Sequence, residues 1–197
     1  QEAIKPFLGD SFGNAGSVHR EGRAAAQGVS DAREAVAELL GCRLKEVVFT
    51  GSGTEANNLA ILGTALKRRE LEGRDHIVAI ATEHETIMEP MRFLETLGFS
   101  IDFVPVDGLG RWQSEAVVDR CTERTALVSA TVANYEIGTM GPVASLASPL
   151  HELGVYLHTD AAVAAGWMDL KPAELGVDLM TLSAHKFGGL KGAGALY

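Results

Sequence analysis

The feature that most constrains this chain is a repeated alternation of short apolar runs with segments of helical periodicity. The apolar runs are typical of strands, and they lie at 46–50, 76–81, 100–106, 126–133, 155–160, 178–184 and 192–197. Helical patterns precede or separate them, at 17–40, 56–66, 83–98, 115–121 and 146–154. This order of elements predicts an α/β fold with a mostly parallel sheet.

The chain of 197 residues is long enough for one sizeable domain with a buried core, and its sequence shows no linker or internal repeat. Parallel strands are joined by right-handed crossovers, and ligands bind beyond their carboxyl ends. We therefore expect functional side chains directly after the strands. The turn-rich stretch 9–17 is expected to be a surface loop.

Charge and cysteine content exclude several classes of function. A formal net charge of −9 disfavours binding to nucleic acid. Two cysteines, Cys42 and Cys121, are too few for a disulfide framework, so we expect the protein to lie in the reducing cytoplasm. No cluster of residues has the spacing of metal ligands, so we expect no metal site. No apolar run is long enough to cross a membrane, and the first residues do not resemble a signal peptide. Since residue 1 is not Met and the last residues have the pattern of a strand, we expect a piece of a longer protein.

The segment GSGTEA, 51–56, follows one predicted strand and opens a helix. Its glycines, its backbone N–H groups and the Thr54 hydroxyl fit a phosphate group at a helix N-terminus, whereas the simpler interpretation is a tight turn. The segment also fits the GxGxxA pattern of dinucleotide-binding folds, which requires an acidic residue about 20 positions later. Glu83 comes later than that, so the dinucleotide interpretation fits poorly.

Three further side chains follow predicted strands, and each also has an ordinary structural interpretation. His84 begins a helix, where a histidine is commonly solvated or a cap. Asp160 ends the strand 155–160, where it either faces a ligand or caps the next helix. Lys186 follows the strand 178–184; a lysine is usually a solvated charge, but burial among small and apolar neighbours would favour a neutral, nucleophilic amine.

The order of these residues along the chain favours one cofactor. A phosphate loop, a histidine, a strand-end aspartate and a strand-end lysine all fall at the same predicted edge of the sheet. Pyridoxal phosphate requires this set: a cradle for its phosphate, a group that stacks on its ring, an acid beside its pyridine nitrogen and an amine that binds it covalently. The sequence therefore predicts a site for pyridoxal 5'-phosphate.

The successive motifs resemble those of class V aminotransferase-type enzymes, most closely the cysteine desulfurases of the NifS and IscS kind. These motifs are GNAGSVHREGRAA, FTGSGTEANNLAI, TEHETI, NYEIGTMGPV, HTDAAVAAG and DLMTLSAHKFGGLKGAGALY. The resemblance covers nearly the whole chain, and its last motif is highly specific. It implies the large domain of a fold-type I pyridoxal phosphate enzyme, a three-layer α/β/α transferase domain with a mixed sheet. This domain would span residues 1–197, be incomplete at both ends and belong to a homodimer.

Matched by position, Lys186 corresponds to the lysine that binds the cofactor covalently, His84 to the histidine that stacks on its ring and moves protons, and Asp160 to the carboxylate beside the pyridine nitrogen. The phosphate-binding positions correspond to Gly53, Thr54, Ser183 and His185. In the implied reaction, L-cysteine takes the place of the enzyme lysine on the cofactor. A cysteine thiolate of the enzyme then attacks the substrate sulfur. Its products are L-alanine and an enzyme persulfide.

Two positions of the cofactor site depart from the family pattern. Val163 stands where the family has a glutamine near the phenolic oxygen of the cofactor, and it cannot form that hydrogen bond. Tyr135 stands where the family has an asparagine that contacts cofactor and substrate, and its bulk changes the substrate pocket. The nucleophilic cysteine and the substrate-binding arginine of the family lie in a later, smaller domain, so Cys42 and Cys121 are interpreted as structural. We expect these residues alone to turn over no cysteine.

The leading expectation is a pyridoxal phosphate-dependent cysteine desulfurase of the cytoplasm, as in iron–sulfur cluster biogenesis. L-Cysteine would be its substrate and a sulfur-acceptor protein its partner, with no nucleic acid or membrane involved. Another class V enzyme, either an aminotransferase or a selenocysteine/cysteine lyase, is the alternative that Tyr135 and Val163 leave open. A catalytically silent scaffold paralogue and a nicotinamide-dinucleotide protein built on 51–56 are further alternatives.

Overall fold

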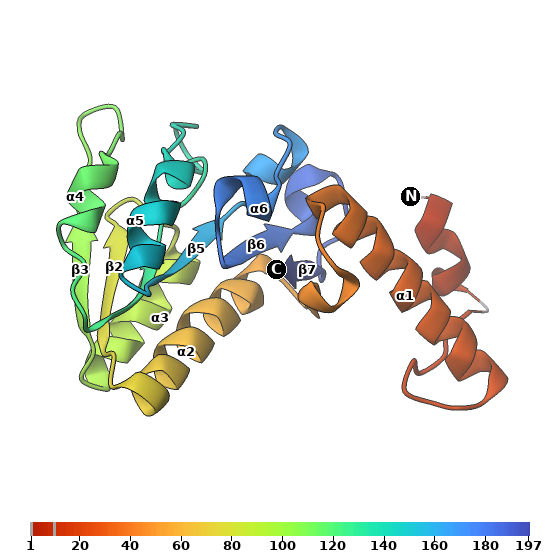
Figure 1. The fold of residues 1–197 in the computed structure, drawn as a ribbon. Coiled ribbons are helices and arrows are strands. Elements are labelled where there is room, and N and C mark those ends of the chain that lie inside the picture. The colour runs from red at the N-terminus through yellow and green to blue at the C-terminus, as the bar shows by residue number, and fades with distance from the viewer. Residues whose placement is uncertain (1, 10) are drawn as a thin grey trace. The chain divides into compact units, whose positions relative to one another are not determined.

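The computed structural model describes residues 2–9 and 11–197, which form two compact units. One unit extends to residue 47 and the other runs from 48 to 197. The first is helical and contains a 3-10 helix, Glu2–Leu8, the long helix α1, Arg20–Leu40, and a short 3-10 turn, Leu44–Glu46 (Figure 1). The second unit contains the sheet and every residue of the predicted cofactor site.

Helix α1 begins later than the predicted 17–40 but ends where expected. The His19 side chain caps its first turn, because Nδ1 accepts a hydrogen bond from the Gly22 backbone N–H at 3.2 Å. Gly41 ends the helix in the left-handed conformation, with φ of 65°, which glycine adopts without steric cost. The predicted loop 9–17 contains no helix or strand among its described residues, and Asp10 lies outside them.

The second unit is built on one mixed sheet, to which residues 48–197 contribute seven strands. Their bounds are β1 Val48–Thr50, β2 His76–Ile80, β3 Ser100–Val104, β4 Thr125–Ser129, β5 Tyr156–Asp160, β6 Leu179–Ser183 and β7 Gly194–Leu196. The spatial order is β1-β7-β6-β5-β4-β2-β3, with β7 antiparallel to both neighbours and the strands from β6 to β3 parallel. The predicted mostly parallel mixed sheet is confirmed.

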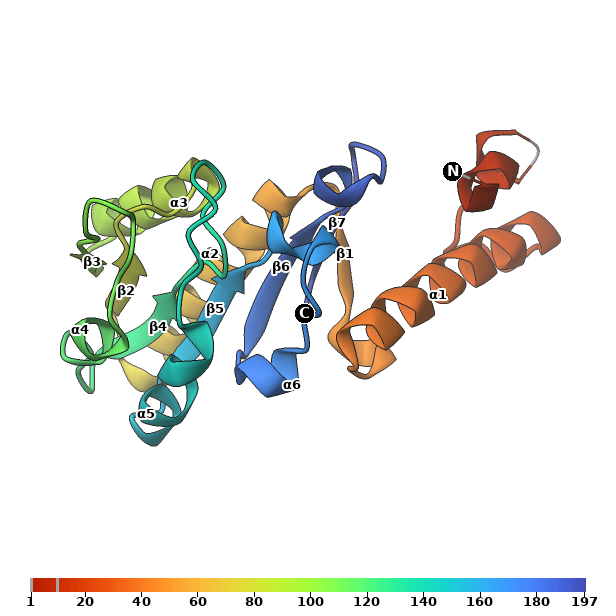
Figure 2. The same ribbon diagram turned by 90° about the horizontal axis from the view of Figure 1, so that it is seen from above.

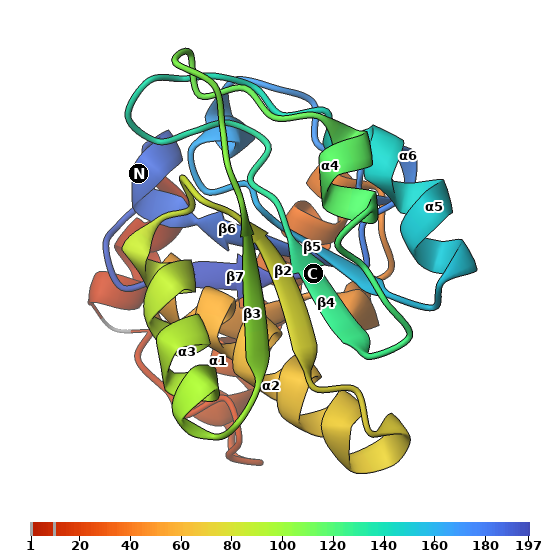
Figure 3. The same cartoon turned by 90° about the vertical axis from the view of Figure 1, so that its left-hand side faces the viewer.

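Helices cover both faces of this sheet. Two long helices, α2 Gly53–Glu72 and α3 Glu85–Thr96, lie on one face (Figure 2). The other face carries the shorter helices α4 Ser114–Val118, α5 Ala147–Glu152 and α6 Pro172–Leu175 (Figure 3), together with the 3-10 turn Val143–Leu146. The predicted three-layer α/β/α arrangement is therefore confirmed.

Several strands are shorter than the apolar runs that predicted them. Strand β3 ends at Val104, because Pro105 has no N–H to donate to the sheet. Strand β4 ends at Ser129, four residues before the end of the predicted strand 126–133. The residues that follow leave the sheet, and Thr131 and Ala133 line a pocket at its edge.

The buried face of α2 does not include its leucines Leu59 and Leu66. Leu59 and Leu66 are 47% and 39% exposed. The residues that face the sheet are mostly small: Gly53, Ala56, Asn57, Ala60, Ile61 and Ala65. Small side chains let the helix lie close to the strands, which hydrophobicity alone does not reveal. This close approach brings the N-terminus of α2 to the carboxyl ends of the parallel strands.

The middle of the sheet also contains a buried polar row. His158 on β5 lies between Ser129 on β4 and Thr181 on β6, with ring nitrogen-to-oxygen distances of 2.9 and 3.1 Å. Burial lowers the pKa of His158 to about 3, so its ring is neutral in the folded chain at physiological pH. Both ring nitrogens are paired, so His158 is a structural residue that ties three strands together.

Candidate active site

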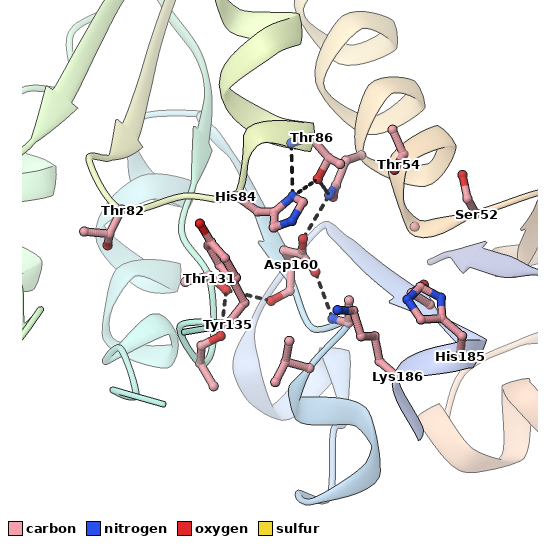
Figure 4. Close-up of a pocket in the computed structure, with 16 residues that line it drawn as sticks. Ser52, Thr54, Thr82, His84, Thr86, Thr131, Tyr135, Asp160, His185 and Lys186 are labelled. Carbon is pink, nitrogen blue, oxygen red and sulfur yellow. Dashed lines mark hydrogen bonds between the residues drawn. The ribbon is translucent and has the colours of Figure 1, made fainter. Parts of the chain in front are cut away.

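The carboxyl ends of the parallel strands surround one pocket (Figure 4). Side chains reach it from the segments after β1, β2, β4, β5 and β6. Its lining consists of Ser52, Gly53, Thr54, Asn57, Thr82, His84, Thr86, Thr131, Ala133, Tyr135, Asp160, Ala162, Val163, Ser183, His185 and Lys186. All nine residues that the sequence predicts for the site are in this lining. The structure thus brings together predicted residues that lie up to 133 positions apart, from Gly53 to Lys186.

One end of the pocket has the donors that a phosphate group requires. Helix α2 starts there, and the Ser52 side chain caps it by accepting a hydrogen bond from the Glu55 N–H at 3.1 Å. Ser183 Oγ and His185 Nδ1 lie 3.1 Å apart in the same lining. Gly53 packs so closely on Ser183 that an added Cβ would lie 2.9 Å from the serine Cβ. Glycine is needed here because of close packing, and its φ is not in the left-handed region.

Asp160, the acid that the sequence predicts for the site, ends β5 as expected. Oδ1 accepts a hydrogen bond from the Ala162 N–H at 2.8 Å, and Oδ2 accepts one from Asn57 Nδ2 at 2.9 Å. Burial raises the pKa of Asp160, while these two donors and the positive charge of Lys186 oppose the rise. Each oxygen keeps a lone pair, so the carboxylate has room for a cationic N–H partner.

Lys186 lies in the 3-10 turn Ala184–Phe187, directly after β6. Its position after a strand agrees with the sequence, but the predicted burial is wrong, because the residue is exposed. The glycines that follow it carry no side chains, and Gly188 turns the chain away in the left-handed conformation at φ of 89°. Lys186 is thus an amine at the open rim of the pocket, in the same lining as Asp160 (Figure 4).

His84 is both the N-cap of α3 and part of the pocket lining. Its Nδ1 accepts a hydrogen bond from the Thr86 N–H at 3.1 Å. Its ring meets the ring of Tyr135 edge to face, with centroids 4.7 Å apart and planes at 75°. The structural and the functional interpretations of His84 therefore do not compete, because one ring nitrogen caps the helix while the ring lines the pocket.

The two positions that depart from the family pattern also lie in the pocket. Tyr135 follows Asn134, which fixes the loop by donating to the Thr82 carbonyl and accepting from the N–H groups of Glu136 and Ile137. Val163 follows β5 by three residues and presents an apolar side chain beside the polar lining. Relative to the family pattern, the pocket thus lacks an amide at both positions and has an aromatic ring at one of them.

Comparison with known proteins identifies the family. The model of the family described as "Aminotransferase class-V" matches residues 1–197. The chain belongs to the class-V aminotransferase family. Members of this family are pyridoxal phosphate-dependent enzymes, which agrees with the chemistry of the pocket. Family membership overturns the dinucleotide interpretation of the segment 51–56.

Relatives within the class-V aminotransferase family carry a more specific name. The protein named cysteine desulfurase IscS of Dictyoglomus turgidum is 43% identical over 196 residues, which is all of this chain and 49% of that protein. Putative cysteine desulfurase IscS 1 of Bacillus subtilis is 39% identical over 196 residues and 51% of its length. The chain therefore spans about half the length of the curated relatives it matches.

Solved structures agree with the fold. A structure titled "SspA in complex with cysteine" superposes with a TM-score of 0.94 at 35% identity, covering all of this chain and 56% of that one. A structure titled "NIFS-LIKE PROTEIN" gives a TM-score of 0.93 at 34% identity, with 100% and 54% coverage. The α/β fold of the family is thus shown for this chain.

Five polar lining residues are not among those that the sequence predicts for the site: Asn57, Thr86, Thr131, Ser52 and Thr82. Two signals point to the first two. Asn57 lies one helical turn after Gly53, on the face that the phosphate loop already uses, and Thr86 lies two residues after the capping His84. Thr131 falls inside a run that the sequence predicts as strand, so nothing in the pattern distinguishes it. Its hydroxyl donates to the carbonyl of Asp160 at 3.0 Å.

The two cysteines do not have the properties of a thiolate nucleophile. Both are free thiols. Burial raises the pKa of Cys121 to about 11 and also raises the pKa of Cys42, and the thiolate is the reactive form. Among the described residues, no group of three metal-ligating side chains is found and no helix is long and apolar enough to span a membrane.

Glu83 has a structural place beside the site. It is buried, and Oε1 accepts a hydrogen bond from the Thr131 N–H at 2.7 Å, while Oε2 has no partner among the described residues. Burial raises the pKa of Glu83 well above its ordinary 4.5, and the charge of Asp160 raises it further. The carboxyl therefore supports the loop after β4, and in the folded chain it favours the protonated form.

Substitution of Glu83 by glutamine is expected to change how stability depends on pH. Since the folded pKa is raised, the folded state binds a proton that the unfolded state loses, and this stability is lost as pH rises from 4.5 toward the folded pKa. Glutamine keeps an acceptor for Thr131 and has no proton to lose. The free energy of unfolding of Glu83→Gln, minus that of the wild type, should therefore increase as pH rises. Urea titrations at pH 5, 6, 7 and 8 measure this difference. A constant difference would contradict this prediction.

Proposed function

We propose that the full-length protein is a pyridoxal phosphate-dependent cysteine desulfurase that takes sulfur from L-cysteine and releases L-alanine. The observation that carries the proposal is the convergence of Lys186, Asp160 and His84 in one pocket whose far end has hydroxyl and backbone donors. The names of the relatives support the choice of reaction. The similar structure titled "SspA in complex with cysteine" supports the choice of substrate.

The residues present fit this cofactor. The N-terminus of α2 supplies free N–H groups and a positive dipole for a phosphate, and the hydroxyls of Thr54 and Ser183 lie in the same lining. Gly53 leaves room there that a side chain would close. At the other end, Asp160 has spare acceptor capacity for a protonated ring nitrogen. An amine, Lys186, is available to hold the cofactor.

When bound, pyridoxal phosphate supplies an electron sink that stabilises negative charge at Cα of an amino acid. The protein has four tasks in that chemistry. Ser183, His185 and the start of α2 would hold the phosphate, and the Asp160 carboxylate would keep the pyridine nitrogen protonated. His84 would pack against the pyridine ring and hold a proton on its own imidazole. The Lys186 amine would bind the cofactor and move a proton at the substrate Cα.

The sulfur-transfer step needs a thiolate. Because the pKa of Cys121 is raised to about 11 by burial and that of Cys42 is also raised, neither supplies one near neutral pH. We therefore assign the nucleophile to a cysteine outside these 197 residues. We further propose that the protein acts as a homodimer and passes its sulfur to an acceptor protein, in keeping with the resemblance to the NifS and IscS kind.

A second candidate within the family is favoured by one observation. The Tyr135 ring packs on His84 with ring centroids 4.7 Å apart, and Val163 lies in the same pocket lining. By the resemblance to cysteine desulfurases, these positions would carry an asparagine and a glutamine, and both changes would alter the pocket. An aminotransferase or a selenocysteine/cysteine lyase would use the same cofactor residues with a different substrate.

The products formed from L-cysteine separate these reactions. The full-length protein is incubated with pyridoxal phosphate, L-cysteine and a reductant, and alanine, sulfide and keto acid are measured. The proposal predicts equal amounts of alanine and sulfide. A keto acid formed only with an amino-group acceptor would indicate an aminotransferase, and turnover of selenocysteine but not cysteine would indicate a lyase. Absence of the visible absorbance of bound cofactor would exclude all three and favour a silent paralogue.

A further inference from the structure

One buried amide contacts two of the reactive groups of the pocket. Asn57 lies on α2 and is 1% exposed. Its Nδ2 has two hydrogens and donates one to Asp160 Oδ2 and the other to Thr86 Oγ1, each at 2.9 Å. Figure 4 shows these hydrogen bonds as dashed lines that end on Asp160 and Thr86. A single side chain thus links the strand-end acid to the first turn of α3.

The orientation of this amide is set by its hydrogens. If the group were turned over, Oδ1 would face the carboxylate of Asp160, and that hydrogen bond would be replaced by a contact between two acceptors. In the observed orientation Oδ1 is buried and has no partner among the residues that the structure describes. A buried oxygen without a donor opposes folding. The amide is therefore not explained by stability alone, because its oxygen remains unpaired while both hydrogens are used.

Thr86 extends the link to His84. Its backbone N–H donates to His84 Nδ1 at 3.1 Å, so this nitrogen is an acceptor. The Thr86 hydroxyl accepts a hydrogen bond from Asn57, which leaves its own hydrogen to donate to the same Nδ1 at 2.9 Å. In the neutral ring the proton therefore lies on Nε2, the nitrogen that this cap leaves unused.

We propose that Asn57 is a positioning residue that sets the acid and the histidine of the site together. One hydrogen of its amide holds the Asp160 carboxylate in the orientation that would face the pyridine nitrogen of the cofactor. The other, through the Thr86 hydroxyl, adds a second donor to His84 Nδ1 beside the Thr86 backbone N–H, and so further favours the proton on Nε2. The effect on cofactor binding rests on the proposed function, whereas the arrangement of His84 is a property of the cofactor-free pocket.

Three variants of the full-length protein test the link. Asn57→Leu removes the amide at similar volume, Thr86→Val removes the hydroxyl and keeps the backbone N–H, and Thr86→Ser keeps both. Nitrogen-15 NMR of labelled histidine in cofactor-free protein reports the tautomer of His84. The wild type is expected to show the proton on Nε2. We expect Asn57→Leu and Thr86→Val to shift the Nδ1 resonance in the same direction, and Thr86→Ser to restore it.

Binding of pyridoxal phosphate gives the second readout. Asn57→Leu should weaken binding about tenfold, as for loss of a hydrogen bond to a charged group. Because Thr86 acts on Asp160 through Asn57, the double variant Asn57→Leu/Thr86→Val should bind pyridoxal phosphate as weakly as Asn57→Leu and no more weakly. Effects that multiply in the double variant would overturn the link, as would an unchanged Nδ1 resonance in Thr86→Val.

Failure of the two proposals can be told apart. If the wild type binds no pyridoxal phosphate but the Nδ1 resonance responds as expected, the proposed function fails and the positioning role of Asn57 stands. If the wild type binds the cofactor and neither readout responds to Asn57→Leu or Thr86→Val, the positioning role fails alone. Since Thr86 is only partly buried, Thr86→Val decides the question even where Asn57→Leu does not fold.

Discussion

Replacement of Lys186 by alanine is expected to remove the visible absorbance of the bound cofactor and to abolish measurable turnover of L-cysteine. The lysine provides the only amine in the described pocket lining, so no neighbour replaces its bond to the cofactor. It is also the group placed to move a proton at the substrate Cα, and positioned proton transfer alone contributes about 10²–10⁴-fold to a rate. Absorbance spectra and sulfide release from the full-length protein measure both effects.

Lys191 provides the matched control for this substitution. It is an exposed lysine five positions further along the same glycine-rich segment and is not in the pocket lining. Lys191→Ala should keep the wild-type spectrum and turnover. If Lys186→Ala kept the visible absorbance while Lys191→Ala lost it, the assignment of the reactive amine would be wrong.

Replacement of Asp160 by asparagine is expected to lower turnover by about 10²–10³-fold, the range seen when one preorganised electrostatic contact is removed. The neutral amide no longer keeps the ring nitrogen protonated. It also cannot accept from both present donors, since either the Ala162 N–H or the Asn57 amide would then face an N–H group. We therefore expect the cofactor to bind more weakly and its absorbance band to shift with pH.

Asp169 serves as the control for the change of charge. Its side chain is 76% exposed and pairs with Lys171 on the surface, and it is not in the pocket lining. Asp169→Asn should therefore leave turnover and spectrum unchanged. Full turnover in Asp160→Asn would show that the carboxylate is not beside the ring nitrogen.

The sequence places three of its predicted site residues at the ends of parallel strands, and the structure brings all three into one pocket lining. Asp160 is the last residue of β5, while His84 and Lys186 come shortly after β2 and β6, and parallel strands bring these ends to one edge. A pattern of apolar runs is sufficient to locate such positions. The same reasoning fails for Thr131, because the run 126–133 continues past the point where the chain leaves the sheet.

Side-chain environments were harder to predict than positions. Exposure of Lys186 depends on which segments cover the rim of the pocket, and local sequence does not contain this information. Leu59 and Leu66 of α2 lie outside its buried face, because close approach to the sheet favours small residues over large ones. The role of Asn57 follows only from three-dimensional contacts, since its partners are 29 and 103 positions away.

The central claim, that this pocket holds pyridoxal phosphate through Lys186, has one direct test. The full-length protein is loaded with pyridoxal phosphate, treated with borohydride to fix any bond between cofactor and amine, digested and analysed by peptide mass spectrometry. We predict the added mass of the reduced cofactor on Lys186, in the peptide that contains SAHKFGG. Its presence on another lysine, or on no lysine at all, would contradict the account.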